Sequence, residues 1–374
     1  MLYRKMKSTG DKVSVLGFGC MRFPTDDDGN IKKNESEKML DYAVDNGVNY
    51  FDTAWPYHGE KSEPFVGNYF QDNRKDIYLA TKLPSWKIEK REDMDEYFKK
   101  QLKRLKTDYI DYYLLHALNK KRWEQLLEKD IFDFVEDIKK KNKIRAIGFS
   151  FHGKLETFKD IIDSYDWDFC QIQYNFMDTN YQAGLEGLKY AADKGIDLVI
   201  MEPLRGGMLT SNVPEDIQEI WNNLGKNSSP AEWALRWVWN HPEVTITLSG
   251  MSAMNHVKEN INVSDKAVAN SLTDKQLAII DKVRKTYDER TRVNCTNCKY
   301  CMPCPNGVNI PAAFRFYNNA YIYNEFERMK NFYNRALDDD SKASKCIECG
   351  ECLDKCPQNI SIIEKLKEVA EAFE

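Results

Sequence analysis

The stretch Phe51-Asp52-Thr53-Ala54-Trp55-Pro56-Tyr57 decides the fold. The apolar run from Val48 to Phe51 ends in an acid, and a tyrosine follows five residues later, just after a proline. This order predicts a buried strand that runs into a loop, with two ionisable side chains at the carboxyl end of the strand. Parallel β/α barrels carry their active sites on the face formed by these strand ends. The stretch therefore predicts a barrel strand and one edge of a site.

Two further ionisable residues take the same position after the next two apolar runs. Lys82 follows the run 78–81, and His116 follows the run 112–115. The carboxyl ends of parallel barrel strands all lie on one face, so we expect Asp52, Tyr57, Lys82 and His116 to meet there.

A strand–helix alternation with a spacing of about 30 residues continues along the chain, as βαβ units require. The strand-like runs are rich in Ile, Val, Leu, Phe and Tyr, with little alternation, which is typical of strands buried on both faces. Eight of them predict an α/β fold, a (β/α)8 TIM barrel. The runs are Val15–Met21, Asn49–Ala54, Ile77–Leu83, Ile110–Ala117, Ile144–Phe151, Phe169–Asn175, Asp197–Pro203 and Thr245–Gly250.

The segments between the strands have helical patterns. We expect helices over Glu35–Asn46, capped by Asn34, and over Asp93–Lys106, whose apolar residues recur at helical spacing. Thr273 and Gln276 form a capping box that starts a late helix. Residues 204–229 are too long for an ordinary loop, and we expect them to lie over the active face. Residues 2–14 resemble a short hairpin that closes the other end of the barrel.

Composition excludes several classes of function. The 374 residues are 42% hydrophobic and carry a net charge of −5, with no basic stripe, so we expect no nucleic-acid partner. No apolar run approaches the roughly 18 residues of a membrane span, so we expect no membrane partner. The first residues lack the apolar segment of a signal peptide, which predicts a cytoplasmic protein.

Ten cysteines in such a chain indicate metal or redox chemistry rather than disulfides. Cys20 and Cys170 stand alone, and we expect them to be small core residues. The other eight form two bursts, Cys295-x-x-Cys298-x-x-Cys301-x-x-Cys304-Pro305 and Cys346-x-x-Cys349-x-x-Cys352-x-x-x-Cys356-Pro357. Zinc sites usually take their four ligands from two separated pairs, and the three closely spaced cysteines of each burst do not fit that pattern.

Three cysteines spaced by two residues wrap one face of an iron–sulfur cube, and a fourth beside proline ligates the other cluster. The tail thus resembles a bacterial two-cluster ferredoxin with a long insertion between its halves. We predict one [4Fe–4S] cluster on Cys295, Cys298, Cys301 and Cys356, and another on Cys346, Cys349, Cys352 and Cys304. The spacing from Cys301 to Cys304 is one residue shorter than usual. The insertion is rich in aromatic residues from Phe314 to Tyr333, which predicts a helix. The predicted domains are 1–290 and 291–374.

The four strand-end residues suit proton transfer to an oxygen. A phenol has a pKa near 10, and a neighbouring ammonium lowers it, so Lys82 would make Tyr57 a better acid. A buried lysine needs a counter-charge, and Asp52 is the nearest candidate. His116 can donate a hydrogen bond to a substrate carbonyl while a hydride arrives at its carbon. The alternative is a structural ion pair and a core histidine, but four such groups at successive strand ends favour a site.

These motifs resemble the aldo-keto reductase family over about residues 3–285. The matching segments are Phe51-Asp52-Thr53-Ala54-x-x-Tyr57, Ala80-Thr81-Lys82 and Asp111-Tyr112-Tyr113-Leu114-Leu115-His116. The resemblance implies Tyr57 as acid/base, Lys82 and Asp52 as its tuning pair, and His116 as the residue that orients the carbonyl. It also implies NAD(P)H bound without a Rossmann glycine motif, and no G-x-G-x-x-G is present. Family members with a cysteine tail of this kind form a recognisable subgroup.

The same resemblance implies a set of cofactor contacts. They are Gly19, Cys20, Met21, Ser150, Gln171, Met201, Leu204, Gly206, Gly250, Ser252, Glu259 and Asn260. Two positions depart from the family pattern: Met201 replaces the aromatic residue that stacks on nicotinamide, and His256 replaces an arginine near the 2′-phosphate. Lys258 or Arg205 could serve that phosphate instead. NADPH, NADH and a flavin such as FMN therefore all stay open.

We predict an oxidoreductase that reduces an aldehyde or ketone, or oxidises the alcohol, and is coupled to electron transfer through two [4Fe–4S] clusters. Trp55 and Trp86 near the site suit a small, mostly apolar carbonyl compound. Ferredoxin or another electron carrier is a possible partner. One alternative is a ferredoxin-linked electron-transfer enzyme with a flavin in the barrel. Another is a redox-sensing or scaffold protein whose clusters are structural.

Overall fold

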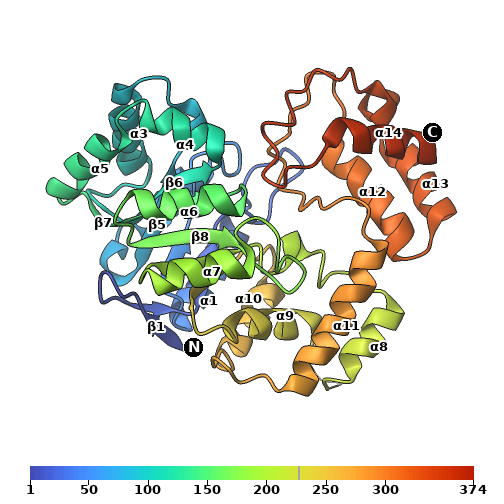
Figure 1. Ribbon diagram of the computed structural model, residues 1–374, viewed down its shortest axis with the longest axis horizontal. Helices are drawn as coiled ribbons and strands as arrows, with labels where there is room; N and C mark the ends of the chain where they lie inside the picture. Colours follow the sequence, from blue (N-terminus) through green and yellow to red (C-terminus); the bar gives the residue numbers. More distant parts are fainter. Residues whose placement is uncertain (226–227) are drawn as a thin grey trace. The chain divides into compact units, whose positions relative to one another are not determined.

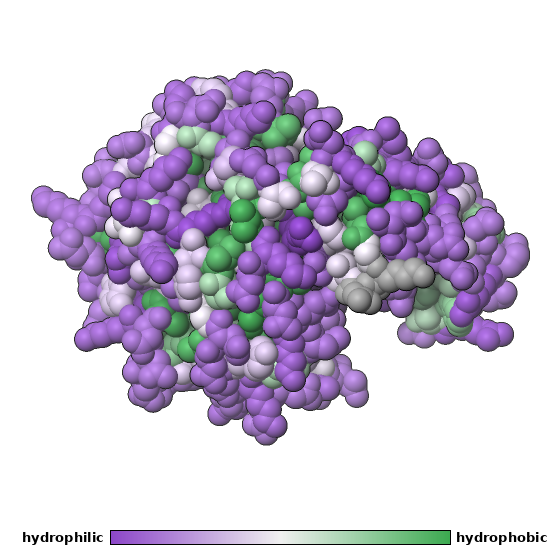
Figure 2. Space-filling view, turned by 90° about the horizontal axis from the view of Figure 1, so that it is seen from below, coloured by the Kyte–Doolittle hydropathy of each residue, from purple (hydrophilic) through white to green (hydrophobic). Residues whose placement is uncertain are grey.

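The computed structural model describes residues 1–225 and 228–374. Within them the chain divides into two compact units, 1–204 with 231–272 and 205–230 with 273–374. The first holds the sheet structure, and the second is helical in its regular elements. Hydrophilic residues predominate on the face seen in Figure 2, with hydrophobic residues in smaller groups between them, as a sequence with 30% charged residues requires.

Eight parallel strands close into a barrel in the order β10-β3-β4-β5-β6-β7-β8-β9. Of these, β5, β6, β7 and β8 are labelled in Figure 1. Every predicted strand is present, which confirms the (β/α)8 fold. The strands are β3 Leu16–Gly19, β4 Tyr50–Asp52, β5 Tyr78–Leu83, β6 Ile110–Leu118, β7 Ile144–Phe151, β8 Phe169–Gln173, β9 Asp197–Met201 and β10 Val244–Ser249. All residues of β6, β8 and β10 are buried, because one face of the sheet lines the barrel and the other packs under helices.

The expected N-terminal hairpin is also present. β1, Tyr3–Lys5, pairs antiparallel with β2, Lys12–Ser14. Its Met6 and Val13 are buried in one cluster with barrel residues such as Tyr50. Tyr112 inside the barrel donates a hydrogen bond of 2.8 Å to Asp11 of the hairpin. The hairpin thus supplies side chains that close the amino end of the barrel.

The remaining elements of the first unit are helices and short 3₁₀ turns. They are α1 Lys33–Asp45, α2 Ser62–Phe70, η1 Arg74–Asp76, η2 Ser85–Lys87, α3 Arg91–Arg104, α4 Lys120–Leu127, α5 Ile131–Lys140, α6 Leu155–Ser164, α7 Gly184–Asp193, α9 Pro230–Trp239 and α10 Met254–Ser264. The expected cap of α1 is wrong: the helix starts before Asn34, at Lys33, with Lys32 at the N-cap position and no side-chain cap. A backbone hydrogen bond from the Ser36 N–H to the Lys32 carbonyl forms the first turn of the helix.

The second unit contains η3 Arg205–Gly207, α8 Glu215–Asn222, α11 Asp274–Arg290, α12 Ile310–Ile322, α13 Phe326–Ala336, η4 Asp339–Ser341, η5 Ala343–Lys345 and α14 Ile362–Phe373. The capping box of α11 forms as predicted, with Thr273 and Gln276 bonded reciprocally. Figure 1 shows α12, α13 and α14 lying together, and they bury a core of their own around Phe314, Tyr333 and Phe373.

The single helix expected over Phe314–Tyr333 is wrong. The chain breaks between α12 and α13, where Asn324 takes a left-handed backbone conformation with φ of 54°. Asparagine tolerates that conformation better than most residues, so it can end one helix and redirect the chain into the next. Residues 205–230 and α11 group with the cysteine-rich tail in the second compact unit, and the domain boundary at residue 290 stays a prediction.

Candidate active site

Three of the four strand-end side chains lie on the adjacent strands β4, β5 and β6, and the fourth lies in the loop after β4. Asp52 ends β4, Lys82 lies one residue before the end of β5, and His116 lies near the end of β6. In the parallel register Asp52 pairs with Ala80, and Lys82 pairs with Leu114. Tyr57 follows β4 in the loop before α2. We call Asp52, Tyr57, Lys82 and His116 the tetrad below.

Lys82 is the centre of the tetrad. Its Nζ lies 2.6 Å from Asp52 Oδ1 and donates a second bond of 2.8 Å to the Thr53 carbonyl. The Tyr57 hydroxyl lies 3.4 Å from the same Nζ. The Lys82 side chain is 1% exposed, so its positive charge acts on the phenol with little screening by water. The structure therefore brings Asp52, Lys82 and Tyr57 together at one point.

Burial and direct contact act in opposite directions on the ion pair. Burial raises the pKa of the Asp52 carboxyl, whereas Lys82 and the side chain of Gln171 favour its charged form. Burial likewise lowers the pKa of Lys82, and Asp52 opposes that change. Removing either partner alone would leave an uncompensated charge in the barrel, which costs about 3–5 kcal/mol.

His116 is held as a neutral imidazole. Burial, and then the nearby charges of Lys82 and Arg122, lower its pKa well below the usual value for histidine. Its ring centroid lies 5.1 Å from that of Trp86 and 6.1 Å from that of Tyr57. A neutral imidazole has one N–H to donate, which suits the expected hydrogen bond to a carbonyl oxygen.

The backbone beside His116 is strained and braced. Ala117 has a left-handed φ of 53°, which is unfavourable for a residue with a Cβ. Its N–H donates 2.7 Å to the Ser150 hydroxyl, and its carbonyl accepts 2.7 Å from Arg122. Ser150, expected as a cofactor contact, thus also holds the peptide next to His116. The sequence does not predict this contact of Arg122, because an arginine in a charged helix looks like an ordinary surface residue.

The low pKa of His116 predicts a pH-dependent stability. An unfolded histidine takes up a proton below about pH 6.5, while the buried ring resists it, so stability is complete above that pH and falls as pH falls. We expect the unfolding free energy to lose up to about 1.4 kcal/mol per pH unit from this group below pH 6.5. Denaturant unfolding between pH 7.5 and 5.5 should show a smaller acid loss in His116→Gln than in the native protein. Equal slopes would contradict the buried neutral state.

Several expected cofactor contacts lie on other strands of the barrel, β3, β8 and β9. Gln171, in β8, is 2% exposed, and its Oε1 has no hydrogen-bond partner among the described residues. A primary amide such as the nicotinamide carboxamide could donate to it. Gly19 lies against the backbone of Ser249 and Gly250, where an added Cβ would lie 3.3 Å from the Ser249 carbonyl oxygen. Met201, at the end of β9, is partly exposed.

The predicted adenosine contacts lie in the loop between β10 and α10 and in the middle of α10. Asn260 is buried and donates 2.9 Å to the Ser249 hydroxyl, whereas Ser252 is exposed. Glu259 is partly exposed, and Lys258 lies 5.6 Å from the centre of the Tyr42 ring. Met21 and Leu204 are partly exposed. Gly206 and Arg205 belong to the second compact unit, with Gly206 in a left-handed conformation.

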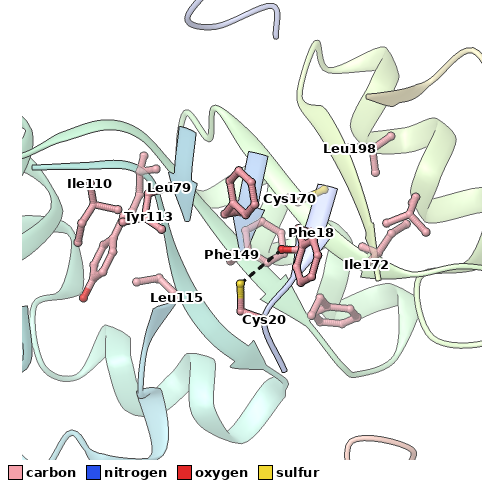
Figure 3. Packing of buried hydrophobic residues seen from close by; sticks show 14 of the residues in the cluster. Phe18, Cys20, Leu79, Ile110, Tyr113, Leu115, Phe149, Cys170, Ile172 and Leu198 are labelled. Carbon is pink, nitrogen blue, oxygen red and sulfur yellow. Dashed lines mark hydrogen bonds between the residues drawn. The ribbon is translucent and has the colours of Figure 1, made fainter. Parts of the chain in front are cut away.

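Cys20 and Cys170 lie inside the hydrophobic cluster between strands and helices (Figure 3). Both are fully buried, and burial raises the pKa of each thiol above the usual value. The Cys20 thiol lies 3.7 Å from the Phe18 carbonyl oxygen, and its own carbonyl accepts from Ser62. The Cys20 thiol therefore lies in the core, and the backbone N–H and carbonyl of this residue are bonded to the Asp52 carbonyl and the Ser62 hydroxyl.

The eight cysteines of the tail fall into two sets in the second unit. Cys304, Cys346, Cys349 and Cys352 line one cavity together with apolar residues that include Ile310, Ile363 and Leu366. Burial, followed by the charges of Cys298, Cys295 and Cys356, raises the pKa of Cys301 to about 12, so these four thiols are also neighbours. Each set thus combines three cysteines of one burst with the last cysteine of the other burst. The assignment of these cysteines as cluster ligands stays a prediction.

The donor chemistry of both sets fits an iron–sulfur cluster, which is held by four thiolates. Within the described residues, no group of three or more His, Cys, Asp or Glu side chains is arranged for a single metal ion. A cluster differs from a single ion in that its thiolates bind separate irons. The apolar side chains around Cys346 and Cys352 would limit access of water to such a group.

Comparison with known proteins identifies the class. Residues 15–285 match the aldo/keto reductase family, and residues 294–360 match the 4Fe-4S dicluster domain. The chain therefore belongs to the aldo/keto reductase family and is an oxidoreductase with a C-terminal 4Fe-4S domain. No helix in the described residues is long and apolar enough to cross a membrane.

Individual relatives match most of the barrel. An uncharacterised oxidoreductase of Bacillus subtilis, YqkF, is 27% identical over 76% of this chain and 97% of its own length. A probable voltage-gated potassium channel subunit beta of Arabidopsis thaliana is 24% identical over 78% of this chain and 98% of its own. The solved structure of aldo-keto reductase AKR11C1 from Bacillus halodurans, in its holo form, is 27% identical, with a TM-score of 0.64 over 76% of this chain and 96% of that one.

Proposed function

We propose that the protein reduces a small aldehyde or ketone with NAD(P)H at the tetrad, or oxidises the corresponding alcohol, and exchanges electrons through two [4Fe–4S] clusters. One observation carries the first part. Lys82 Nζ contacts both Asp52, at 2.6 Å, and the Tyr57 hydroxyl, at 3.4 Å, in a water-poor position at the strand ends. A structural ion pair alone would not need a phenol beside its cation.

The tetrad supplies the proton and fixes the carbonyl. Tyr57 donates its phenolic proton to the carbonyl oxygen, and Lys82 stabilises the phenolate that remains. Asp52 keeps Lys82 charged and in place. His116, neutral at physiological pH, donates a hydrogen bond to the same oxygen and sets its orientation. The Trp86 ring, 5.1 Å from that of His116, gives the site apolar surface, which suits an apolar substrate.

A reduced nicotinamide, when bound, supplies a hydride to the carbonyl carbon. The residues that would hold it are Gln171 and Ser150 at the carboxamide and Asn260 with Glu259 at the adenosine end. The buried oxygen of Gln171, which has no partner within the described chain, supports this fit. NADH is as compatible as NADPH, since His256 stands where relatives carry an arginine.

The two cysteine sets would hold the clusters, one on Cys295, Cys298, Cys301 and Cys356, the other on Cys304, Cys346, Cys349 and Cys352. Clusters carry single electrons, whereas hydride transfer moves two. A ferredoxin or another one-electron carrier would therefore be their partner. In functional terms we divide the chain into a reductase part, 1–290, and a cluster part, 291–374. We assign the protein to the cytoplasm, where reduced cysteines persist.

A second candidate places a flavin such as FMN in the barrel, with a ferredoxin as the electron donor. The observation that favours it is Met201 at the end of β9, in place of an aromatic residue that would stack on nicotinamide. A redox-sensing or scaffold role is the third candidate. One relative named as a channel subunit favours it, but the assembled tetrad supports an enzyme.

The cofactor decides between the first two candidates. The protein should be purified without oxygen, its clusters extracted, and its visible spectrum recorded. We expect no flavin band, micromolar binding of NADPH or NADH by fluorescence titration, and oxidation of the bound cofactor on addition of an aldehyde. A flavin band without nicotinamide binding would instead establish the second candidate.

A further inference from the structure

Glu63 is a buried acid that the tetrad does not use. It lies in the first turn of α2 and is fully buried. Thr81 and the Gln101 amide each donate 2.7 Å to its Oε1, and Arg104 Nε lies 2.7 Å from its Oε2. Burial raises the pKa of this carboxyl, and all three partners favour its charged form. A buried carboxylate with three partners is a costly arrangement, which calls for a reason.

The sequence builds this arrangement through a close contact of two helices. Gly67 lies one turn after Glu63 in α2. A Cβ at Gly67 would lie only 2.4 Å from the Arg104 carbonyl oxygen at the end of α3, so only glycine permits this approach. The approach brings the start of α2 and the end of α3 within reach of each other, which lets Glu63 contact both Gln101 and Arg104.

One arm of the network reaches the backbone of Lys82. Gln101, whose Nε2 donates to Glu63, also donates 3.0 Å to the Lys82 carbonyl. Its Oε1 accepts 2.8 Å from the Tyr113 hydroxyl, which fixes the orientation of the amide. Thr81, the direct neighbour of Lys82 in β5, donates to Glu63 from the outer face of the barrel. Hydrogen bonds of Gln101 and Thr81 therefore fix the backbone of Lys82 from the helix side of the barrel.

The other arm reaches the loop that carries Tyr57. The Arg104 guanidinium lies 4.2 Å from the centre of the Trp55 ring and donates to the Glu60 carbonyl. Trp55 and Glu60 stand on either side of Tyr57 in the sequence. Between them the loop is strained, because His58 and Glu60 both have left-handed backbones, with φ of 53° and 68°. Such residues persist only where surrounding contacts hold them.

We propose that Glu63 and Arg104 are positioning residues: Arg104 clamps the strained loop on both sides of Tyr57, and Glu63 fixes Arg104 and the peptide of Lys82 from the same point. The pair thereby sets the distance between the Tyr57 hydroxyl and the Lys82 ammonium. This inference rests on the proposed role of the tetrad. It assigns neither residue a contact with substrate.

The test measures the pKa of Tyr57 directly. Tyrosine labelled with ¹³C at Cζ gives a signal that shifts on ionisation, and Tyr57→Phe identifies the signal of interest. Arg104→Met removes the clamp but keeps much of the side-chain volume. We expect the Tyr57 pKa in this variant to rise by about 0.5 unit or more toward that of a free phenol, because the released loop lets the Tyr57 hydroxyl move away from the Lys82 ammonium. We also expect kcat for carbonyl reduction to fall by about 10- to 100-fold with little change in cofactor KM.

A double variant separates positioning from folding. Arg104→Met alone leaves the Glu63 charge buried without its ion pair, which lowers stability. In Glu63→Gln/Arg104→Met this pair carries no buried charge, so much of the stability should return. The Tyr57 pKa and kcat should stay altered, because the clamp on Trp55 and Glu60 is still missing. Recovery of both to native values would overturn the proposal.

A matched control removes another buried ion pair of the same barrel. Arg74 and Asp111 lie 2.7 Å apart, with Asp111 near the start of β6 and 1% exposed. Asp111→Asn should lower stability much as Glu63→Gln does, yet leave the Tyr57 pKa unchanged. An equal pKa shift in Asp111→Asn would show a general effect of destabilisation and overturn the proposal. Failure of the tetrad hypothesis would appear separately, as full activity in Tyr57→Phe.

Discussion

Tyr57→Phe is expected to lower kcat/KM for carbonyl reduction by about 10²- to 10⁴-fold, the range attributed to general acid catalysis by a positioned side chain. The change removes one oxygen that lies 3.4 Å from Lys82 Nζ and leaves the ring in place. Cofactor binding should stay within about twofold, because the phenol is not among the residues expected to hold the cofactor. Steady-state kinetics and fluorescence titration measure both quantities.

Tyr78→Phe is the matched control for that experiment. Tyr78 begins β5, the strand that carries Lys82 near its other end, so it shares the strand but not the site. It should retain activity within about threefold. Native activity in Tyr57→Phe would contradict the acid role of the phenol and remove the central support for the proposed reaction.

Cys349→Ala is expected to lower the iron content from about eight to about four atoms per chain, because it would remove one of the four ligands proposed for one cluster. Cys349 is exposed, so its loss as a packing residue should be small. Cys298→Ala should remove the other cluster and leave the first. Iron and acid-labile sulfide assays, with electron paramagnetic resonance after reduction, count the clusters that remain.

Ile347→Ser controls for changes in the same loop. Ile347 lies between Cys346 and Cys349 and is 62% exposed, and it offers no metal ligand. It should keep about eight irons per chain. An unchanged iron content in Cys349→Ala would refute the ligand assignment, even though the thiols line one cavity.

The sequence predicts the barrel well because its signals are local. Each strand is a short apolar run, and ionisable residues such as Asp52 and Lys82 mark its carboxyl end. The tetrad follows from those signals together with the rule that parallel strand ends share a face. The chain beyond residue 272 is harder, since aromatic residues continue across the break at Asn324 and conceal it.

The supporting contacts could not be predicted, because they depend on distances between elements. Glu63 follows the polar residues Glu60-Lys61-Ser62 in the sequence, so nothing there marks it as buried or pairs it with Arg104. The brace of Ala117 by Ser150 and Arg122 is hidden for the same reason. The grouping of residues 205–230 with α11 depends on packing between α8 and α11, which are far apart in the chain.

The neighbouring positions of β4, β5 and β6 have a consequence for how the protein folds. The tetrad lies within residues 52–116, on strands that pair with their nearest successors, so its assembly requires only short loops to close. Closing the ring requires β10 to pair with β3, which joins Ser249 to Phe18 across most of the barrel sequence. Since long-range pairing is slow, we expect the tetrad side chains to meet early, while β10 and β3 pair late. Pulse-labelling hydrogen exchange would then protect the amides of β5 before those of β10.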